Sequence, residues 1–417
     1  MKSCLITVLL LCSSIANADQ EPPSDRDRIL SAIRDAADYA ATTLIATDGR
    51  GRIEYDLIAG RWRDYEVHWH TAQTAFGLLK AYELTGEPNY LQAATRAGDW
   101  WIATEFKAPH PFAGLVNAAH GDRLGSLINM TTITDGSNAI FELSRITGDP
   151  KYAESAVRSG DWLLENAYLP EYGLFYNIFE AETGEVWKDR SPHHPDVGPE
   201  DIKVTQVARP NSEGYLYADM CRFTGEQRYC EVFLSVADKK IDSQHPNGLW
   251  MDFEPNDPDT GKIHPRFNIW LAEAQLEAFE LTGKKKYLKS ALATARAMAR
   301  LQDTDGTIYY RNFADGRTRK TDFTGSAVAF SGLLWLRLEA EGYSEFRDNI
   351  ERSVQWLIDN QFDAYHPDAN VRGAFLNTRM RRTDNGVAIY QRDIGTSFGL
   401  RFLVAYLQSE AADTTRD

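Results

Sequence analysis

Thr85-Gly86-Glu87-Pro88-Asn89-Tyr90 is the first copy of a pattern that recurs along the 417-residue chain and predicts its fold. Four further glycines stand in similar surroundings, each with an aromatic residue four positions later. They are Gly148, Gly225, Gly283 and Gly342, followed by Tyr152, Tyr229, Tyr287 and Phe346. A glycine supplies the left-handed cap that ends a helix, and the aromatic residue begins the buried face of the returning helix. We therefore interpret each copy as the turn of a helix hairpin.

The repeats predict five hairpins and leave one helix unpaired at each end of the chain. The pairs are 66–85 with 87–105, 132–147 with 149–167, 211–224 with 226–243, 264–282 with 284–302, and 322–341 with 343–361. The unpaired helices are 25–47 and 390–409. If these two pair, every apolar face is covered, whereas an open solenoid needs polar capping repeats. We predict an all-α fold in one domain over residues 19–417, an (α/α)6 toroid, with (α/α)7 as the alternative.

The first residues are typical of a secretory signal. Lys2 precedes an apolar run at 5–11, and Ala16-Asn17-Ala18 is a small-residue cleavage site. We expect residues 1–18 to be removed after Ala18 and the protein to be periplasmic or secreted. No later stretch is long and apolar enough to be a membrane helix. The net charge of −15 argues against nucleic acid as a partner, and we expect a monomer.

Two cysteines remain after removal of the signal. Cys221 and Cys230 lie on either side of the turn at Gly225, so an antiparallel hairpin brings them face to face. An oxidising compartment makes a disulfide plausible. Two buried free thiols remain the alternative.

The functional site is expected at the end of the ring where the inner helices begin, because the loops there are long, roughly 20 to 45 residues, and long loops are usually functional. Capping explains polar residues such as Thr134 and Asp135 at these starts. It does not explain cations, which oppose the helix dipole. The cations at these starts are His68, His70, Arg209, His264, Arg266 and Arg392. Further arginines in the loops, including Arg379 and Arg381, favour an anionic ligand such as a carboxylate-bearing polysaccharide.

These residue types match the needs of β-elimination at a uronate. That reaction requires neutralisation of the carboxylate, a base for the C5 proton, and an acid for the leaving O4. Asn211, Arg209 and Arg266 are candidates for neutralisation, His264 is the preferred base, and Tyr310 the preferred acid, so the predicted catalytic set is His264, Tyr310, Asn211 and Arg266. Substrate-binding residues are predicted at His68, His70, Arg209, Glu213, Asn268, Tyr309, Trp270 and Arg392. His68 and His70 are second-choice bases.

Hydrolysis by two carboxylates on opposite sides of the sugar is the alternative chemistry. Asp135 with Glu213 is the preferred pair, and Asp322 and Asp393 are further candidates. A non-catalytic glycan-binding toroid would present aromatic residues without the converging His, Tyr, Arg and Asn. A sugar 2-epimerase would be similar in shape, but its usual cytoplasmic setting conflicts with the signal peptide.

Three segments resemble the helical-toroid polysaccharide lyases, particularly polysaccharide lyase family 38. They are His264-Pro265-Arg266-Phe267-Asn268-Ile269-Trp270, His68-Trp69-His70-Thr71 and Tyr309-Tyr310. The resemblance implies metal-independent elimination on alginate or glucuronan by Tyr and His, although that family is similar to a seven-hairpin toroid. Asp135-Gly136-Ser137-Asn138 resembles a segment of the unsaturated glucuronyl hydrolases, six-hairpin toroids with Asp catalysts. No metal motif is present, and we expect no cofactor.

Overall fold

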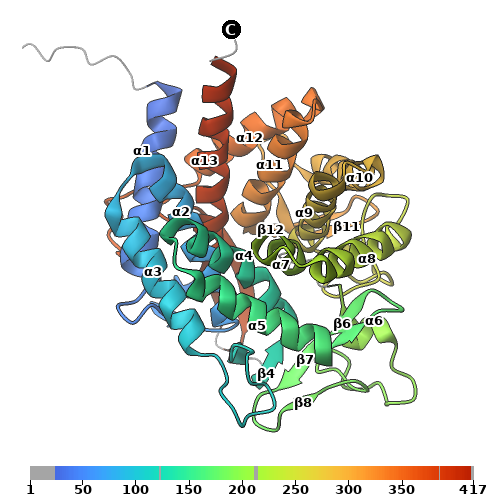
Figure 1. The fold of residues 1–417 in the computed structure, drawn as a ribbon. Coiled ribbons are helices and arrows are strands. Elements are labelled where there is room, and N and C mark those ends of the chain that lie inside the picture. The colour runs from blue at the N-terminus through green and yellow to red at the C-terminus, as the bar shows by residue number, and fades with distance from the viewer. Residues whose placement is uncertain (1–23, 122–123, 211–214, 385, 415–417) are drawn as a thin grey trace, which may run out of the picture.

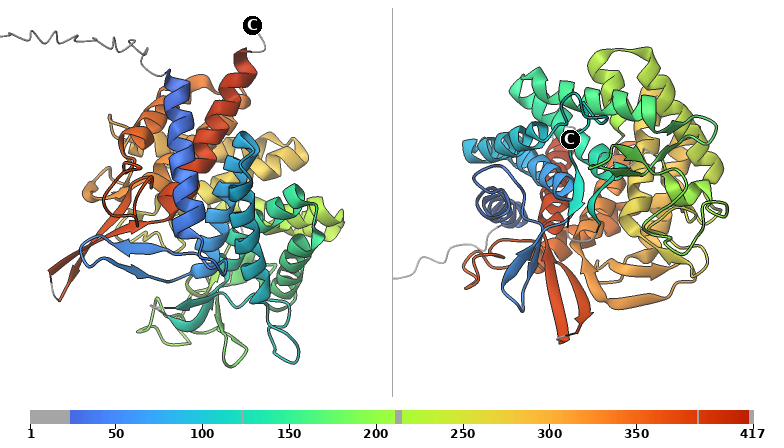
Figure 2. Two further views of the ribbon diagram at one scale, coloured as in Figure 1. Left: turned by 90° about the vertical axis from the view of Figure 1, so that its left-hand side faces the viewer. Right: turned by 90° about the horizontal axis from the view of Figure 1, so that it is seen from below.

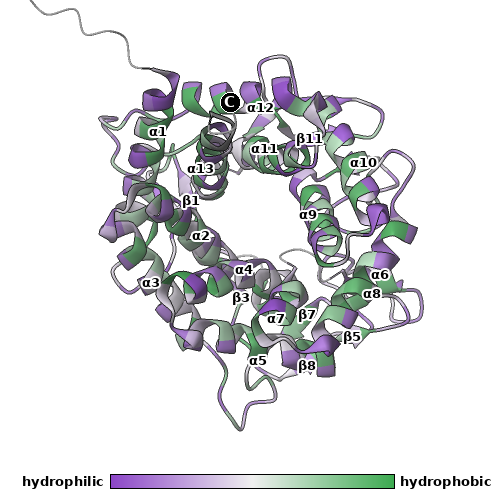
Figure 3. Cartoon of the chain, turned by 45° about the horizontal axis from the view of Figure 1, so that its top comes forward, coloured by the Kyte–Doolittle hydropathy of each residue, from purple (hydrophilic) through white to green (hydrophobic). Residues whose placement is uncertain are grey.

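The helices of this protein form two concentric rings (Figures 1 and 3). The computed structural model describes residues 24–121, 124–210, 215–384 and 386–414. The inner helices are α2 (Val67–Thr85), α4 (Met130–Thr147), α7 (Leu216–Thr224), α9 (Pro265–Thr282), α11 (Gly325–Ala340) and α13 (Ile394–Thr414). The outer helices are α1 (Asp25–Tyr39, continued by a π-helical turn at Ala40–Leu44), α3 (Pro88–Ala103), α5 (Pro150–Asn166), α8 (Gln227–Ser243), α10 (Lys285–Leu301) and α12 (Arg347–Asp359). The predicted (α/α)6 toroid is confirmed, with six hairpins rather than seven in these residues.

Closure depends on the first and last helices, as predicted. α1 packs against α13, and α13 also contacts α2 and α11 on either side. The approach of α2 to α13 is close, because a Cβ added at Gly77 would lie 2.9 Å from the carbonyl oxygen of Ser397. No described helix is long and apolar enough to cross a membrane.

The recurring Gly and Tyr each have a defined structural role. Gly86, Gly148, Gly225 and Gly283 adopt left-handed backbone with φ of 67–73°. The tyrosine hydroxyl that follows each turn donates to an aspartate on the preceding outer helix. The pairs are Tyr90–Asp38 at 2.9 Å, Tyr152–Asp99 at 2.8 Å, Tyr229–Asp161 at 2.7 Å and Tyr287–Asp238 at 2.7 Å. Phe346 has no hydroxyl, and there an ion pair of 2.7 Å between Arg296 and Glu345 joins the neighbouring outer elements.

The all-α prediction missed the strands, which form three small sheets at one end of the ring (Figure 2). The largest runs β10 (Lys262–Ile263), β11 (Tyr309–Phe313), β12 (Thr318–Thr324), β13 (Asn377–Thr383), β14 (Gly386–Arg392), β1 (Glu54–Asp56) and β2 (Arg61–Arg63). The second holds β3 (Ala119–Gly121), β4 (Gly125–Asn129), β7 (Ile178–Glu180) and β8 (Glu185–Val186), and the third β5 (Tyr168–Leu169), β6 (Leu174–Tyr176) and β9 (Ala208–Arg209). These strands have two to seven residues. Many pair with the next strand in the chain, but each sheet also joins loops far apart in sequence, as where β14 pairs with β1 and β4 with β7. The short helices α6 (Val204–Val207) and η2 (Ser344–Phe346) complete the described elements.

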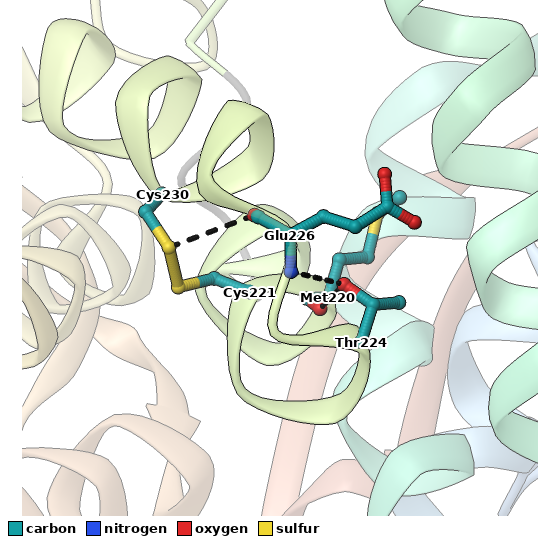
Figure 4. Close-up of a disulfide and its surroundings, with 5 residues drawn as sticks. All are labelled: Met220, Cys221, Thr224, Glu226 and Cys230. Carbon is teal, nitrogen blue, oxygen red and sulfur yellow. Dashed lines mark hydrogen bonds between the residues drawn. A yellow bond between two sulfur atoms is a disulfide. The ribbon is translucent and has the colours of Figure 1, made fainter.

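The third hairpin has a shorter inner helix than predicted, and its two cysteines are bonded to each other. Its inner helix α7 begins at Leu216, not at 211. Cys221 and Cys230 form a disulfide across the turn, with Cα atoms 5.1 Å apart (Figure 4). The hydroxyl of Thr224 accepts from the backbone N–H of Glu226 at 3.1 Å in the same turn (Figure 4). The predicted signal peptide at 1–18 lies outside the described residues.

Candidate active site

A cavity of about 210 Å³ lies where the inner helices begin, at the end of the ring that carries the strands. Inner helices contribute Trp69, Asp135, Arg266 and Trp270 to its wall. Strands and loops of the same end contribute Tyr65, Glu66, His120, Arg209, Tyr310, Arg379 and Arg392. The site is therefore built jointly by the helix starts and by the sheet, and it lies at the predicted end of the ring.

His264 and Tyr310 form the hydrogen-bonded pair at the centre of this wall. His264 is the N-cap of α9, and its Nδ1 accepts from the backbone N–H of Phe267 at 3.1 Å. In the neutral ring the proton is therefore assigned to Nε2, which donates to the Tyr310 hydroxyl oxygen at 2.8 Å. Burial, reinforced by the charge of Arg266, lowers the pKa of His264 well below its usual value. His264 is consequently a neutral donor to Tyr310.

Tyr310 is surrounded by positive charge. The Arg379 guanidinium carbon lies 3.6 Å from the centre of its ring, and that of Arg266 lies 6.0 Å away. Burial raises the pKa of Tyr310, but Arg379, Arg266 and Arg392 together outweigh it and lower the pKa below its usual value. The phenolate form is thus favoured more than in an ordinary tyrosine.

Three arginines around Tyr310 are buried, and each has a side-chain nitrogen without a hydrogen-bond partner in the part of the chain that the structure describes. Arg266, Arg379 and Arg392 are only 4%, 6% and 2% exposed, and the Nε of each has no hydrogen-bond partner among the described residues. Arg266 donates to the Ser326 hydroxyl at 2.9 Å, and Arg392 lies 3.5 Å from a carboxylate oxygen of Glu54. Burial, together with Arg392, lowers the pKa of Arg266 to about 10. Because uncompensated buried charge is costly, this cluster is suited to an anionic ligand.

His70 is buried next to the cavity and accepts a hydrogen bond from Arg392. Its side chain is 0% exposed, its Nε2 accepts from Arg392 Nη2 at 3.5 Å, and its Nδ1 lies 2.7 Å from Oδ1 of Asp393. His68 is also buried, with Nε2 2.7 Å from the Thr104 hydroxyl, and burial lowers its pKa to about 3. Neither histidine lines the cavity. The prediction that they contact substrate or act as a base therefore gains no support from the structure, because both rings are buried behind or beside residues that line the cavity.

The remaining predicted residues divide into three groups. Trp270 and Arg209 line the cavity, together with Asp135 of the alternative pair. Asn268 and Tyr309 do not line it. Asn268 is fully buried, and its Oδ1 accepts from the backbone N–H of Trp250 at 2.7 Å. Tyr309 packs on Phe323. These two predicted substrate contacts likewise gain no support from the cavity lining. Asn211 and Glu213 lie outside the described residues.

Glu66 is a cavity residue that the sequence analysis missed. It precedes α2 with φ of 49°, a left-handed conformation that costs a non-glycine residue free energy and is often found at functional sites. Its carboxylate accepts from Asn129 Nδ2 at 3.3 Å and lies 3.5 Å from His120 Nε2. Backbone strain leaves no trace in composition or spacing, so no sequence signal marked this residue. Among the described residues, no group of three His, Cys, Asp or Glu could hold a metal ion.

Comparisons with known proteins found structures of similar fold but no similar sequence. No protein-family pattern matches the sequence, and no curated protein matches it. The structure is similar to an unsaturated glucuronyl hydrolase from Bacillus sp. GL1, with 16% identity, a TM-score of 0.64, and coverage of 90% of this chain and 96% of that one. It is also similar to a cellobiose 2-epimerase from Bacillus thermoamylovorans, with 13% identity, a TM-score of 0.67, and coverage of 91% and 99%.

A D-mannose isomerase is similar too, with 15% identity, a TM-score of 0.64, and coverage of 93% of this chain and all of that one. Such low identities show the fold alone. These three structures support the (α/α)6 toroid. None of them is a polysaccharide lyase, so the resemblance to lyase family 38 stays a prediction.

Proposed function

We propose that this protein is a secreted enzyme that cleaves a β-1,4-linked uronan, such as alginate or glucuronan, by metal-independent β-elimination. The observation that carries the proposal is Tyr310, which accepts from His264 and lies beside the guanidinium of Arg379 in a cavity rich in buried cations. Export is supported by the disulfide, which is typical of oxidising compartments.

The elimination can be written with Tyr310 as both base and acid. Arg266 and Arg392 neutralise the uronate carboxylate, which acidifies the C5 proton. The Tyr310 phenolate takes that proton, the C4=C5 double bond forms, and the C4–O4 bond breaks. Tyr310 then returns the proton to the departing O4.

This assignment changes the predicted role of His264. To act as the base, His264 would need a free ring nitrogen facing the substrate. Its Nδ1 is occupied by the cap of α9, and its Nε2 carries the proton directed at Tyr310. We therefore assign His264 to stabilising the phenolate and Tyr310 to the proton transfers.

Hydrolysis of unsaturated uronyl oligosaccharides is the second candidate. Two carboxylates, Asp135 and Glu66, line the same cavity, and a glycosidase of this kind requires carboxyl groups facing the sugar. The similarity to the glucuronyl hydrolase structure favours this chemistry over elimination on fold grounds. The cation cluster around Tyr310 favours elimination on grounds of geometry.

One ultraviolet measurement separates the two chemistries, because elimination creates a conjugated double bond that hydrolysis of an unsaturated uronide removes. On intact alginate or glucuronan, we expect absorbance to rise. On purified unsaturated oligosaccharides, we expect no fall. A fall on the second substrate with no rise on the first would establish the hydrolase and refute the lyase.

A further inference from the structure

A second cavity adjoins the first along the sheet. Its volume is about 440 Å³, and it shares Tyr310 and Arg379 with the first cavity. The rest of its wall comes from strands β10 to β13 and the residues beside them: Lys262, Arg311, Phe313, Asp322 and Arg381. Tyr310 therefore stands between two adjoining spaces.

The second cavity has a strong excess of positive charge. Four cationic side chains line it, against the single carboxylate of Asp322. That carboxylate already accepts from the Met380 N–H at 2.9 Å and lies 3.6 Å from Arg311 Nε. Lys262 and Arg381 are partly exposed, and the charge of Lys262 also acts on Asp257, which does not line this cavity. The Nε of buried Arg379 is without a hydrogen-bond partner among the described residues. Cations thus outnumber carboxylates in this wall, which favours an anionic ligand.

We infer that this cavity is a second anion subsite, which holds the uronate next to the one at Tyr310. The inference rests on the proposed function and names its substrate class: a chain with carboxylates on successive sugar units, not a neutral chain with a single terminal uronate. Tyr310 then acts at the linkage between two units, one held by Arg266 and Arg392 and the other by Lys262 and Arg381, with Arg379 between them.

Strand β13 supplies a test residue and a matched control. Side chains alternate between the faces of a strand, so Arg379 and Arg381 share the face that lines the cavity. Arg382 points to the opposite face, is exposed, and lines none of these spaces. Arg381→Ala and Arg382→Ala thus remove equal charge one residue apart.

The experiment measures binding by calorimetry in the Tyr310→Phe background, where substrate is not consumed. The probes are tetrasaccharides from alginate and glucuronan, with methyl glucuronide as the single-uronate probe. Arg381→Ala and Lys262→Ala are expected to weaken tetrasaccharide binding about tenfold, the size of one hydrogen bond to a charged group. Neither should change the affinity for methyl glucuronide, and Arg382→Ala should change neither affinity.

The outcomes distinguish this inference from the proposed function. Tetrasaccharide binding that is unaffected by Arg381→Ala and Lys262→Ala overturns the second subsite but leaves the first intact. Equal losses for the tetrasaccharide and for methyl glucuronide overturn it as well. If the parent protein binds no uronate chain at all, the proposed function falls with it.

Discussion

Nε2 of His264 lies 2.8 Å from the hydroxyl of Tyr310, although 45 residues separate the two in the chain. His264 comes from the start of an inner helix and Tyr310 from a strand of the largest sheet. The pair therefore joins the two structural layers of the site. Most of the testable consequences of the structure follow from this contact and from the charges around it.

Replacing Tyr310 by Phe removes the group assigned to both proton transfers while keeping the ring. We expect turnover on uronan to fall by about 10²–10⁴-fold, the usual contribution of general acid–base catalysis. Tetrasaccharide binding and thermal stability should be nearly unchanged. Measured initial rates close to those of the parent protein would remove Tyr310 from the mechanism.

His264→Asn separates the two roles of the histidine. Asn is a good N-cap, so α9 should keep its start and thermal unfolding should stay within a few degrees. Its side chain is too short to take the place of Nε2, so the phenolate of Tyr310 loses a hydrogen bond. We expect a lower rate with little change in KM. A rate equal to that of the parent protein would show that this contact is only structural.

Arg379→Met tests the electrostatic lowering of the Tyr310 pKa. Burial raises that pKa and Arg379 is the largest opposing influence, so the variant should have a higher pKa. Because the phenolate is the active base, the rise of kcat/KM with pH should move to higher pH. Arg382→Ala, on the exposed face of the same strand, is the control and should leave the profile in place. An unshifted profile in Arg379→Met would contradict the assignment.

Tyr90→Phe tests the contacts that join the outer helices. The variant loses the hydrogen bond to Asp38 and leaves that carboxylate short of a partner, which should lower the free energy of unfolding by about 1–2 kcal/mol. Tyr365→Phe is a matched control, because Tyr365 is 92% exposed. Urea unfolding of both variants provides the comparison, and uronan turnover should be unaltered in each.

Cys221→Ser with Cys230→Ser removes the disulfide across the turn at Gly225. For a nine-residue separation, the loss of chain constraint in the unfolded state is expected to cost about 2–3 kcal/mol. A reducing agent should lower the midpoint of the parent protein and leave that of the double variant unchanged. Equal midpoints under oxidising conditions would show that the bond adds no stability.

The helical ring was largely predictable because its signals are local. A glycine after an apolar helix, and an aromatic four residues later, specify a hairpin within about forty residues. Five such hairpins leave one helix over at each end of the chain, and pairing those two covers every apolar face, which led to the toroid. The position of the site followed from the same pattern, because long loops all precede inner helices. Strands were missed because each has at most seven residues, and because the sheets are completed by pairings between loops far apart in sequence, such as β14 with β1.

The hairpins and the end of the ring that gathers cations follow from residues close together in the chain, so they can be predicted from sequence. Closure of the ring was inferred from the two helices left over at opposite ends of the chain. Which polar residues line the cavity depends on contacts between elements far apart in the chain. His70 and Asn268 do not line it, and Glu66 is brought in by strained backbone. Arg379 on β13 reaches Tyr310 on β11 because both strands pair with β12 between them. Long-range packing sets the direction of each side chain and the field around it, and no local pattern encodes that choice.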